Sequence, residues 1–209
     1  MKSKLLIGVV FTLCCAVNTY GQDGFLDPTF GIGGIVTTDI DDSNDVANDL
    51  IIQPDGKIIA SGYTSNGVID FFCLIRYNIN GTLDTFFGEA GKVVTTFPST
   101  SVGTTMALQQ DGKIVVAGQT WTGTVNTFAL ARYLEDGTLD ASFGNAGIVT
   151  TTFANKNSVG HSVLIQNDGK IVLGGHTFVL ENDNDDFALA RYHYHCLVYR
   201  WHMDELCRP

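Results

Sequence analysis

The chain has 209 residues, of which 44% are hydrophobic, and its 12 basic and 22 acidic residues give a formal net charge of −10. This acidity argues against nucleic acid and anionic membrane surfaces as partners, because both bind clustered Lys and Arg. The length is enough for one sizeable core or two small ones.

The first 21 residues predict a secretory signal peptide. Lys2 and Lys4 precede the apolar run Leu5–Val17, and the small residue Gly21 follows it. This run of 13 residues is shorter than the roughly 20 that span a bilayer. A lipid anchor at Cys14 is disfavoured, because that signal needs a small residue before the cysteine. We therefore expect cleavage after Gly21 and a secreted or cell-surface, extracytoplasmic protein with no membrane span.

Cleavage would leave 10 basic and 22 acidic residues, a net charge of −12. It would also leave three cysteines, Cys73, Cys196 and Cys207. Three cysteines in a chain of this length do not make a disulfide framework, although Cys196 and Cys207 could pair in an oxidising compartment.

Three markers repeat at a nearly constant spacing after the signal. Gly-x-Leu-Asp-x-x-Phe-Gly begins at Gly24, Gly81 and Gly137. Asp-Gly-Lys begins at Asp55, Asp111 and Asp168, and Arg-Tyr begins at Arg76, Arg132 and Arg191. The spacings of 56 to 59 residues define three tandem copies, 24–80, 81–136 and 137–192.

Each copy has the pattern of four short strands. In the first copy these are Gly34–Thr38, a strand ending in Leu50–Gln53, then Lys57–Gly62 and Phe72–Tyr77. Asp-Gly between apolar runs predicts a hairpin with a type I′ turn. No stretch of ten or more residues shows a helical period.

We therefore predict an all-β chain of tandem four-stranded antiparallel units, arranged as a partial β-propeller-like array of three blades. A two-sheet sandwich also uses many short strands, but it does not require this period.

The marker series resembles the Delta-60 repeat of bacterial surface and secreted proteins. It consists of Gly-x-Leu-Asp-x-x-Phe-Gly, Val-Thr-Thr, Asp-Gly-Lys-Ile and Phe-Ala-Leu-Ala-Arg-Tyr, and it covers residues 24–192. The resemblance implies a propeller-like array in an exported bacterial protein, often with more copies than here. It supplies no catalytic residues.

The pattern stops after Tyr192. Residues 193–209 form a divergent tail that holds three of the five histidines, two arginines, Trp201, Cys196 and Cys207. Such a change at a repeat joint suggests a shifted reading frame or a truncation, and either means that the natural array continued. Metal binding by His193, His195, Cys196, His202 and Cys207 is disfavoured, since their spacing matches no standard zinc site.

The charged markers favour structure over catalysis, because a catalytic centre is a single asymmetric site. We expect Arg76, Arg132 and Arg191 to bond the aspartates of the Leu-Asp turns, Asp27, Asp84 and Asp140. Lys57, Lys113 and Lys170 follow hairpin turns and are expected to be solvated. Cys73 aligns with Ala129 and Ala188, which predicts a small buried residue. His161 and His176 show no matching partners.

Two acidic loops, Asp39–Asp45 and Glu181–Asp186, have oxygen ligands suited to calcium. They sit at different points of the repeat and lack an EF-hand pattern, so solvated connecting loops are the favoured interpretation. We assign no catalytic, cofactor-binding or metal-binding residues and expect no cofactor.

The leading functional hypothesis is a non-catalytic extracytoplasmic β-repeat module for interaction or surface architecture, with an unknown protein or glycan partner. The alternatives are a propeller-type hydrolase or lyase fragment and a calcium-dependent glycan-binding module. Because three blades are fewer than the four to eight of closed propellers, we expect self-association or continuation in a longer protein.

Overall fold

The computed structural model describes residues 24–154, 156–179 and 182–193, with the side chains of 182 and 183 left out. All regular secondary structure in these residues is β, in eleven strands and three antiparallel sheets. The predicted all-β array of three blades is therefore confirmed. The described residues contain no helix that could cross a membrane.

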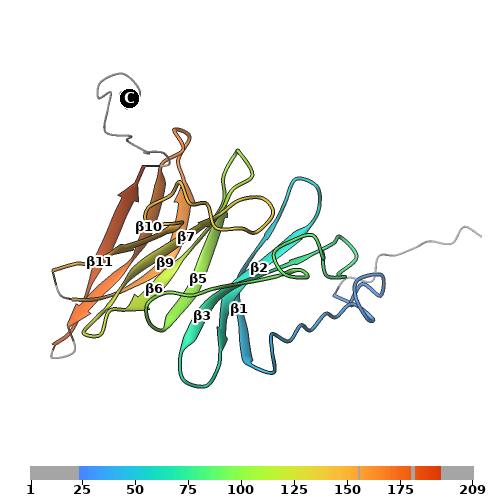
Figure 1. Cartoon of the computed structure of the whole chain (residues 1–209), viewed down its shortest axis with the longest axis horizontal. Coiled ribbons are helices and arrows are strands. Elements are labelled where there is room, and N and C mark those ends of the chain that lie inside the picture. The colour runs from blue at the N-terminus through green and yellow to red at the C-terminus, as the bar shows by residue number, and fades with distance from the viewer. Residues whose placement is uncertain (1–23, 155, 180–181, 194–209) are drawn as a thin grey trace, which may run out of the picture.

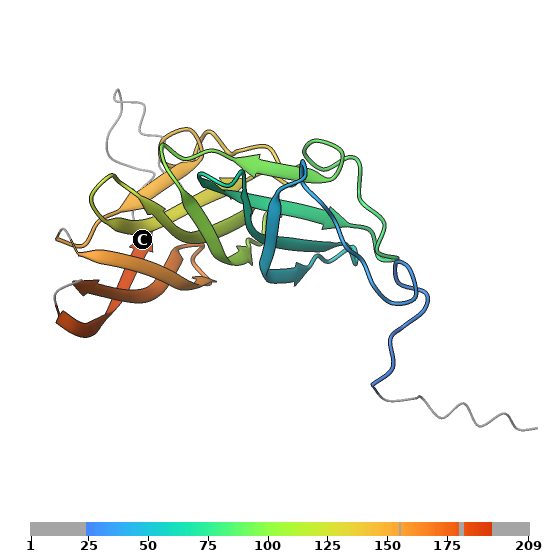
Figure 2. The ribbon, with the colours of Figure 1, turned by 90° about the horizontal axis from the view of Figure 1, so that it is seen from below.

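The three sheets lie side by side in chain order (Figures 1 and 2). Blade 1 contains β1 (Asn44–Ile52), β2 (Ile58–Ser65), β3 (Asp70–Tyr77) and β4 (Lys92–Thr95). Blade 2 contains β5 (Ser101–Leu108), β6 (Ile114–Trp121), β7 (Asn126–Tyr133) and β8 (Ile148–Thr151). Blade 3 contains β9 (Asn157–Ile165), β10 (Ile171–Val179) and β11 (Asn182–Tyr192). Each sheet is a meander in which every strand pairs with the strand before it.

The sheets are offset from the period of the sequence. The segment expected to open the second copy is β4, which pairs with β3 of the copy before it, in the register Phe72↔Thr95 to Ile75↔Lys92. β8 pairs with β7 in the same way. Each completed blade therefore takes its last strand from the following copy.

This offset corrects one predicted strand. Gly34–Thr38 is not a strand, and its only ladder contact is the isolated bridge Ile32↔Ile35. By the same offset, the blade that this segment would complete is not among the three described sheets. Blade 3 shows the converse, because no described strand pairs with the outer side of β11.

The hairpins are present, but the predicted type I′ turn is wrong. That turn needs positive φ at both central residues, whereas only the glycine of each Asp-Gly pair has it, with φ of 81° at Gly112. The Gly112 amide donates to the Gln109 carbonyl at 3.0 Å, and the Gln109 amide donates to the Lys113 carbonyl at 2.8 Å. A turn closed before a left-handed glycine is the longer hairpin loop with a glycine bulge.

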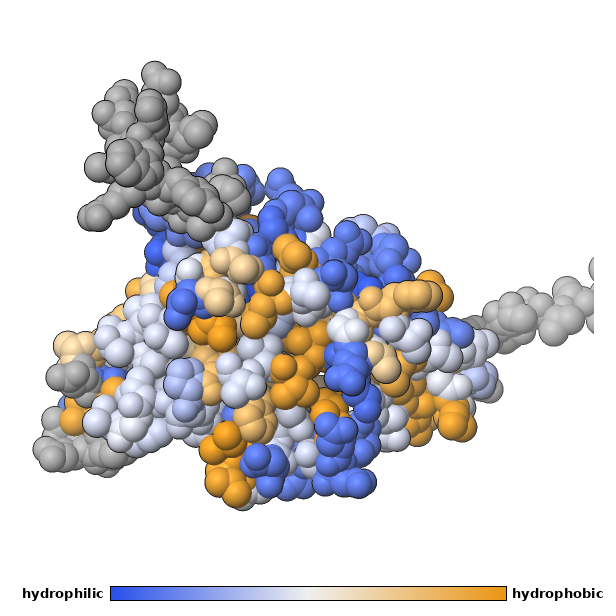
Figure 3. Space-filling model, viewed as in Figure 1, coloured by the Kyte–Doolittle hydropathy of each residue, from blue (hydrophilic) through white to orange (hydrophobic). Residues whose placement is uncertain are grey.

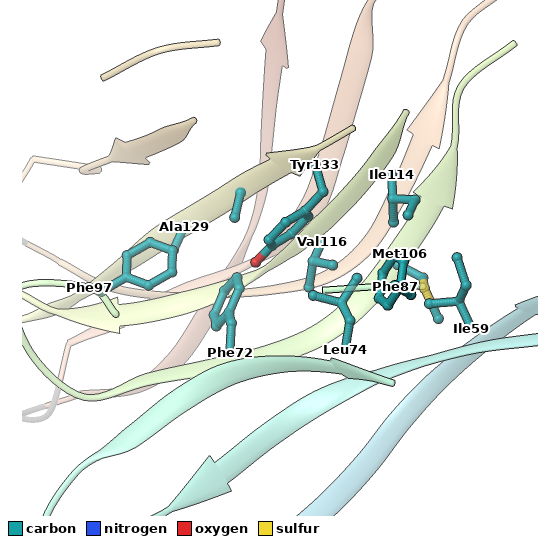
Figure 4. Close-up of a cluster of buried hydrophobic side chains, with 11 residues drawn as sticks. Ile59, Phe72, Leu74, Phe87, Phe97, Met106, Ile114, Val116, Ala129 and Tyr133 are labelled. Carbon is teal, nitrogen blue, oxygen red and sulfur yellow. The ribbon is translucent and has the colours of Figure 1, made fainter. Parts of the chain in front are cut away.

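Apolar side chains alternate with polar ones along the strands, and blade faces pack on each other to make the core. Between blades 1 and 2, Phe72 and Leu74 of β3 point toward Val116 and Tyr133 (Figure 4). Between blades 2 and 3, Phe128 and other apolar residues of blade 2 pack on the opposing face of blade 3. This second cluster includes Val115, Leu130, Phe143, Val163, Ile171, Leu173 and Ala188.

The inner strands approach closely at two glycines. A Cβ placed on Gly103 would lie 2.7 Å from the carbonyl oxygen of Gly62, and one on Gly160 would lie 2.9 Å from that of Gly118. A real side chain at either position would force neighbouring blades apart. The glycines therefore set the blade spacing at the inner edge.

Candidate functional site

The repeated arginines form buried ion pairs. Arg76 Nε lies 2.8 Å from Asp84 Oδ2, and Arg132 Nη2 lies 2.9 Å from Asp140 Oδ2. Each guanidinium also stacks on a phenylalanine of the same loop, with 4.4 Å from its Cζ to the ring centroid. The expected Arg–Asp contact is therefore confirmed for two copies, between each arginine and the Leu-Asp turn that follows it.

The remaining members of the series do not form this pair. Asp27 accepts hydrogen bonds from the Thr29 amide at 2.9 Å and the Thr29 hydroxyl at 2.7 Å. Arg191 is exposed, and the turn that would follow it lies outside the described residues. The pairing depends on a following copy, which is why the two internal joints show it.

The repeated lysines are not simply solvated, as we had expected. Lys57 Nζ lies 3.1 Å from Asp84 Oδ2 and so joins the first ion pair. In the next two copies Lys113 contacts Asp111, and Lys170 contacts Asp168, both at 2.5 Å. These lysines tie the hairpin turn to nearby carboxylates while staying half-exposed.

The two buried carboxylates remain ionised for a physical reason. Burial alone would raise the pKa of Asp140, but hydrogen bonds from Ser142 and the charges of Arg132 and Lys113 outweigh it, so this pKa lies below its ordinary value. Burial would also raise the pKa of Asp84. Hydrogen bonds from Lys57 and the Phe86 amide, together with the charge of Arg76, outweigh burial, so this pKa is lowered as well. A carboxylate held this way is a poor general base, and in both clusters it is the ion-pair partner of the repeated arginine.

Cys73 is buried, as predicted. Burial, with a smaller contribution from the charge of Asp45, raises the pKa of its thiol to about 12. Since the thiolate is the reactive form, this cysteine is chemically inert at neutral pH.

The first acidic loop turns its carboxylates onto its own backbone. Asp39 accepts from the Asp42 amide at 3.0 Å, and Asp45 accepts from the Ile40 amide at 2.7 Å. In the second loop Asp186 pairs with Lys156 at 2.8 Å, and Glu181 lies outside the described residues. No group of three or more metal-capable side chains occurs within the described ranges.

The two histidines that had seemed unpartnered lie together. His161 Nε2 and His176 Nδ1 are 3.0 Å apart, and their rings stack with centroids 5.0 Å apart. A bulge in the β9–β10 register lies between Gly174 and Gly175, and it leaves His161 beside β10. The signal missed in the sequence is that bulge, which the other two copies share at Asn48 and Thr104.

In the tail, His193 is exposed, and His195, Cys196, His202 and Cys207 lie outside the described residues, as does the signal segment 1–21.

A family model described as "Domain of unknown function (DUF5122) beta-propeller" matches residues 53–87, 109–143 and 166–193. Each match begins at a hairpin turn and covers the two strands that follow it, which are β2 and β3, β6 and β7, or β10 and β11. These matches support a β-propeller repeat fold for the chain. A comparison with curated proteins gave no match.

The array of three blades has two open blade faces. The open face of blade 3 carries Leu164, Phe187 and Leu189, and the open face of blade 1 carries Leu50 and Ile52, all of them exposed. Figure 3 shows apolar surface (orange) at the end of the molecule where the N-terminal segment lies. Exposed apolar patches of this kind mark contact surfaces.

A hollow of about 330 Å³ lies between the loop and outer strand that follow β7 and the end of β11. It is lined by Phe143, Gly144, Val149 and Arg191, among others. At the preceding joint the equivalent Phe87 and Val93 surround Gly137, the first residue of the next copy. The hollow therefore corresponds to the space around Gly137 at that joint.

Proposed function

We propose that this β-propeller repeat protein is a non-catalytic, extracytoplasmic module for interaction or surface architecture. The observation that carries the proposal is the use of its charged residues. The same Arg–Asp pair recurs at both internal joints, where it is buried and saturated with hydrogen bonds. A site for chemistry would need charged groups that reach a substrate, whereas the contacts described for these groups are with neighbouring loops and turns.

The inner-strand residues that differ between copies also serve the joints. The Asn48 amide donates to the Gly103 carbonyl at 2.7 Å, and the Thr104 hydroxyl donates to the Gly160 carbonyl at 2.5 Å. Variation at these positions thus preserves a contact between blades. This supports a scaffold over a propeller-type hydrolase or lyase.

The proposed location rests on the basic and apolar pattern of residues 1–21. The full chain and a variant without residues 2–21 should be expressed in a bacterial host and followed by cell fractionation and protease treatment of intact cells. Export of the full chain alone is expected. Retention of both forms in the cytoplasm would overturn the location.

The non-catalytic role is tested separately on the purified protein with panels of glycosidic and ester substrates, and with a glycan array with and without calcium. No turnover is expected. Turnover that is lost on substituting a described residue would establish an enzyme, and calcium-dependent glycan binding would establish the third alternative.

A further inference from the structure

The open face of blade 3 is a blade interface without its neighbour. Phe187 and Leu189 are 98% and 69% exposed. The residues at the same points of blade 2, Phe128 and Leu130, are fully buried against blade 3. The chemistry of this face is therefore suited to the blade that would come next in an array.

The open face of blade 1 is the complementary surface. Leu50 and Ile52 are 64% and 68% exposed. Their counterparts in blade 2, Met106 and Leu108, pack into the joint with blade 1. The open faces of blade 3 and blade 1 are thus equivalent to the two surfaces that meet at an internal blade joint.

The segment Ile35–Thr38 is held where the outer strand of a preceding blade would lie. The Tyr77 hydroxyl donates to Thr38 Oγ1 at 2.8 Å. At the internal joint the Tyr133 and Thr95 hydroxyls are 2.6 Å apart, and Thr95 belongs to β4, the outer strand of blade 1. A backbone hydrogen bond of the internal joint is also present here. The Gly31 amide donates to the Asn80 carbonyl at 2.8 Å, as the Gly88 amide does to the Asp136 carbonyl. It is therefore docked on blade 1 in the position of a fourth strand whose own sheet is missing.

β11 lacks a partner strand on its outer side within the described residues. Its counterparts β3 and β7 each pair on their outer side with a strand of the next copy, in the registers Phe72↔Thr95 and Phe128↔Thr151. The same register predicts Phe187 opposite Thr38 and Ala190 opposite Ile35. A strand edge with unpaired amides and carbonyls is a template for one more strand.

We propose that two copies of this chain close a six-bladed ring, in which Ile35–Thr38 of each copy pairs antiparallel with Phe187–Ala190 of the other. The open face of blade 3 in one copy then packs on the open face of blade 1 in its partner. This assembly does not depend on export or on the absence of catalysis.

Strand counting supports a ring of two. Each chain contributes eleven described strands, and the donated segment completes the third blade, so every blade has four. Six blades lie within the four to eight of closed propellers, whereas three do not. The N-terminal segment and β11 lie at opposite ends of one chain, with blade 2 between them (Figures 1 and 2). Within the described residues, the N-terminal segment therefore does not reach the open edge of β11 in the same chain.

The mass in solution gives the primary test. The chain, purified after expression of the full sequence, should be measured by light scattering coupled to size exclusion from about 1 to 100 μM. Twice the mass of one chain is expected. A monomer throughout this range, or a ladder of larger species, would overturn the closed ring of two.

A face variant tests the surface. Phe187→Glu places a charge in the proposed joint but on an exposed point of the single chain, so circular dichroism and melting of the isolated chain should be kept. Its dimer should be weakened at least about 30-fold, the loss expected for a hot-spot residue. Val68→Glu, at an exposed point of the β2–β3 turn, is the matched control and should leave the dimer intact. Equal dimer affinity of Phe187→Glu and the control would overturn the proposed face.

A disulfide tests the register. In a background with the native cysteines replaced by Ala or Ser, a Thr37→Cys chain is mixed with an Ala188→Cys chain under mild oxidation. The register places these residues opposite each other, at a spacing that a disulfide can bridge. A cross-linked pair is expected from this mixture, and much less from Thr124→Cys mixed with Ala188→Cys. Equal cross-linking in the two mixtures, or none in either, would overturn the strand exchange.

Discussion

Arg132 shows how much of a blade joint depends on one side chain. Its guanidinium is 1% exposed, pairs with Asp140 and Ser142, and covers the ring of Phe143. Burying a charge is costly unless it is paired, and removing one partner leaves the other uncompensated. The cluster thus fixes the loop against the blade, and loss of one member leaves the charge of its partner buried without compensation.

Arg132→Met should therefore lower the free energy of unfolding by about 3–5 kcal/mol. Arg191→Met, at the equivalent but exposed position, is the control and should change it by about 0.5 kcal/mol or less. Urea denaturation followed by circular dichroism measures both. Similar losses in the two variants would contradict the buried pair.

The lowered pKa values of Asp84 and Asp140 predict acid sensitivity. A carboxyl with a lower pKa in the folded chain stabilises it above the unfolded pKa, and that contribution is lost as the pH falls through the folded pKa. The melting temperature should therefore drop as the pH is lowered below about 4, where unfolded aspartates begin to bind protons. Asp140→Asn should flatten this drop as well as lower stability at neutral pH. A parallel profile would show that Asp140 contributes nothing to it.

At the scale of the element, the hairpin glycine has a backbone conformation that residues with a side chain resist. Gly112 has a φ of 81°, and an added Cβ would meet only the end of Glu135, at 3.8 Å. Space is therefore available, and the cost of a larger residue comes from the backbone.

Gly112→Val should destabilise the chain by about 1–3 kcal/mol, because a β-branched residue strongly resists this conformation. Gly112→Asn should cost clearly less, since asparagine tolerates the left-handed region. Thermal melting compares the two. If valine and asparagine cost the same, the turn geometry at this position is wrong.

The sequence predicted the strands because apolar alternation and the Asp-Gly pairs are local signals. It did not predict that β4 joins the preceding sheet, since the period locates a marker but not its hydrogen-bonding partner. For the same reason it predicted a strand at Gly34–Thr38, where the structure has none. Similarly, the contact of His161 with His176 depends on a bulge, which shifts side chains without changing the local pattern.

At the scale of the whole molecule, the ring of two predicts that both of its joints between copies are imperfect. Ala47 occupies the place of Gly103 and Gly160, whose missing side chains allow close approach of the inner strands. At the joint between copies, its methyl group would meet the partner's backbone and hold the inner edges apart.

Ala47→Gly should therefore tighten the dimer about 5-fold or more, by relieving a contact of the overpacking type, which costs about 1–3 kcal/mol. Sedimentation equilibrium gives the dissociation constant. The cost of glycine to the strand itself is present in monomer and dimer alike and cancels. Weaker association of this variant would show that the inner strands do not meet there.

The offset between copy and sheet has a consequence for synthesis on the ribosome. Chains emerge from the amino terminus, and units fold as their residues become available. Blade 1 is incomplete until β4 has left the exit tunnel, after all of the first copy and the opening of the second. Nascent chains stalled at a length that leaves β4 inside the tunnel but β3 outside should thus expose the edge of β3, and longer chains that release β4 should protect it. The last strand of each blade comes from the following copy, so the strand edges become paired in the order of translation. In the proposed ring, the edge of β11 becomes paired only after synthesis, when a second chain binds.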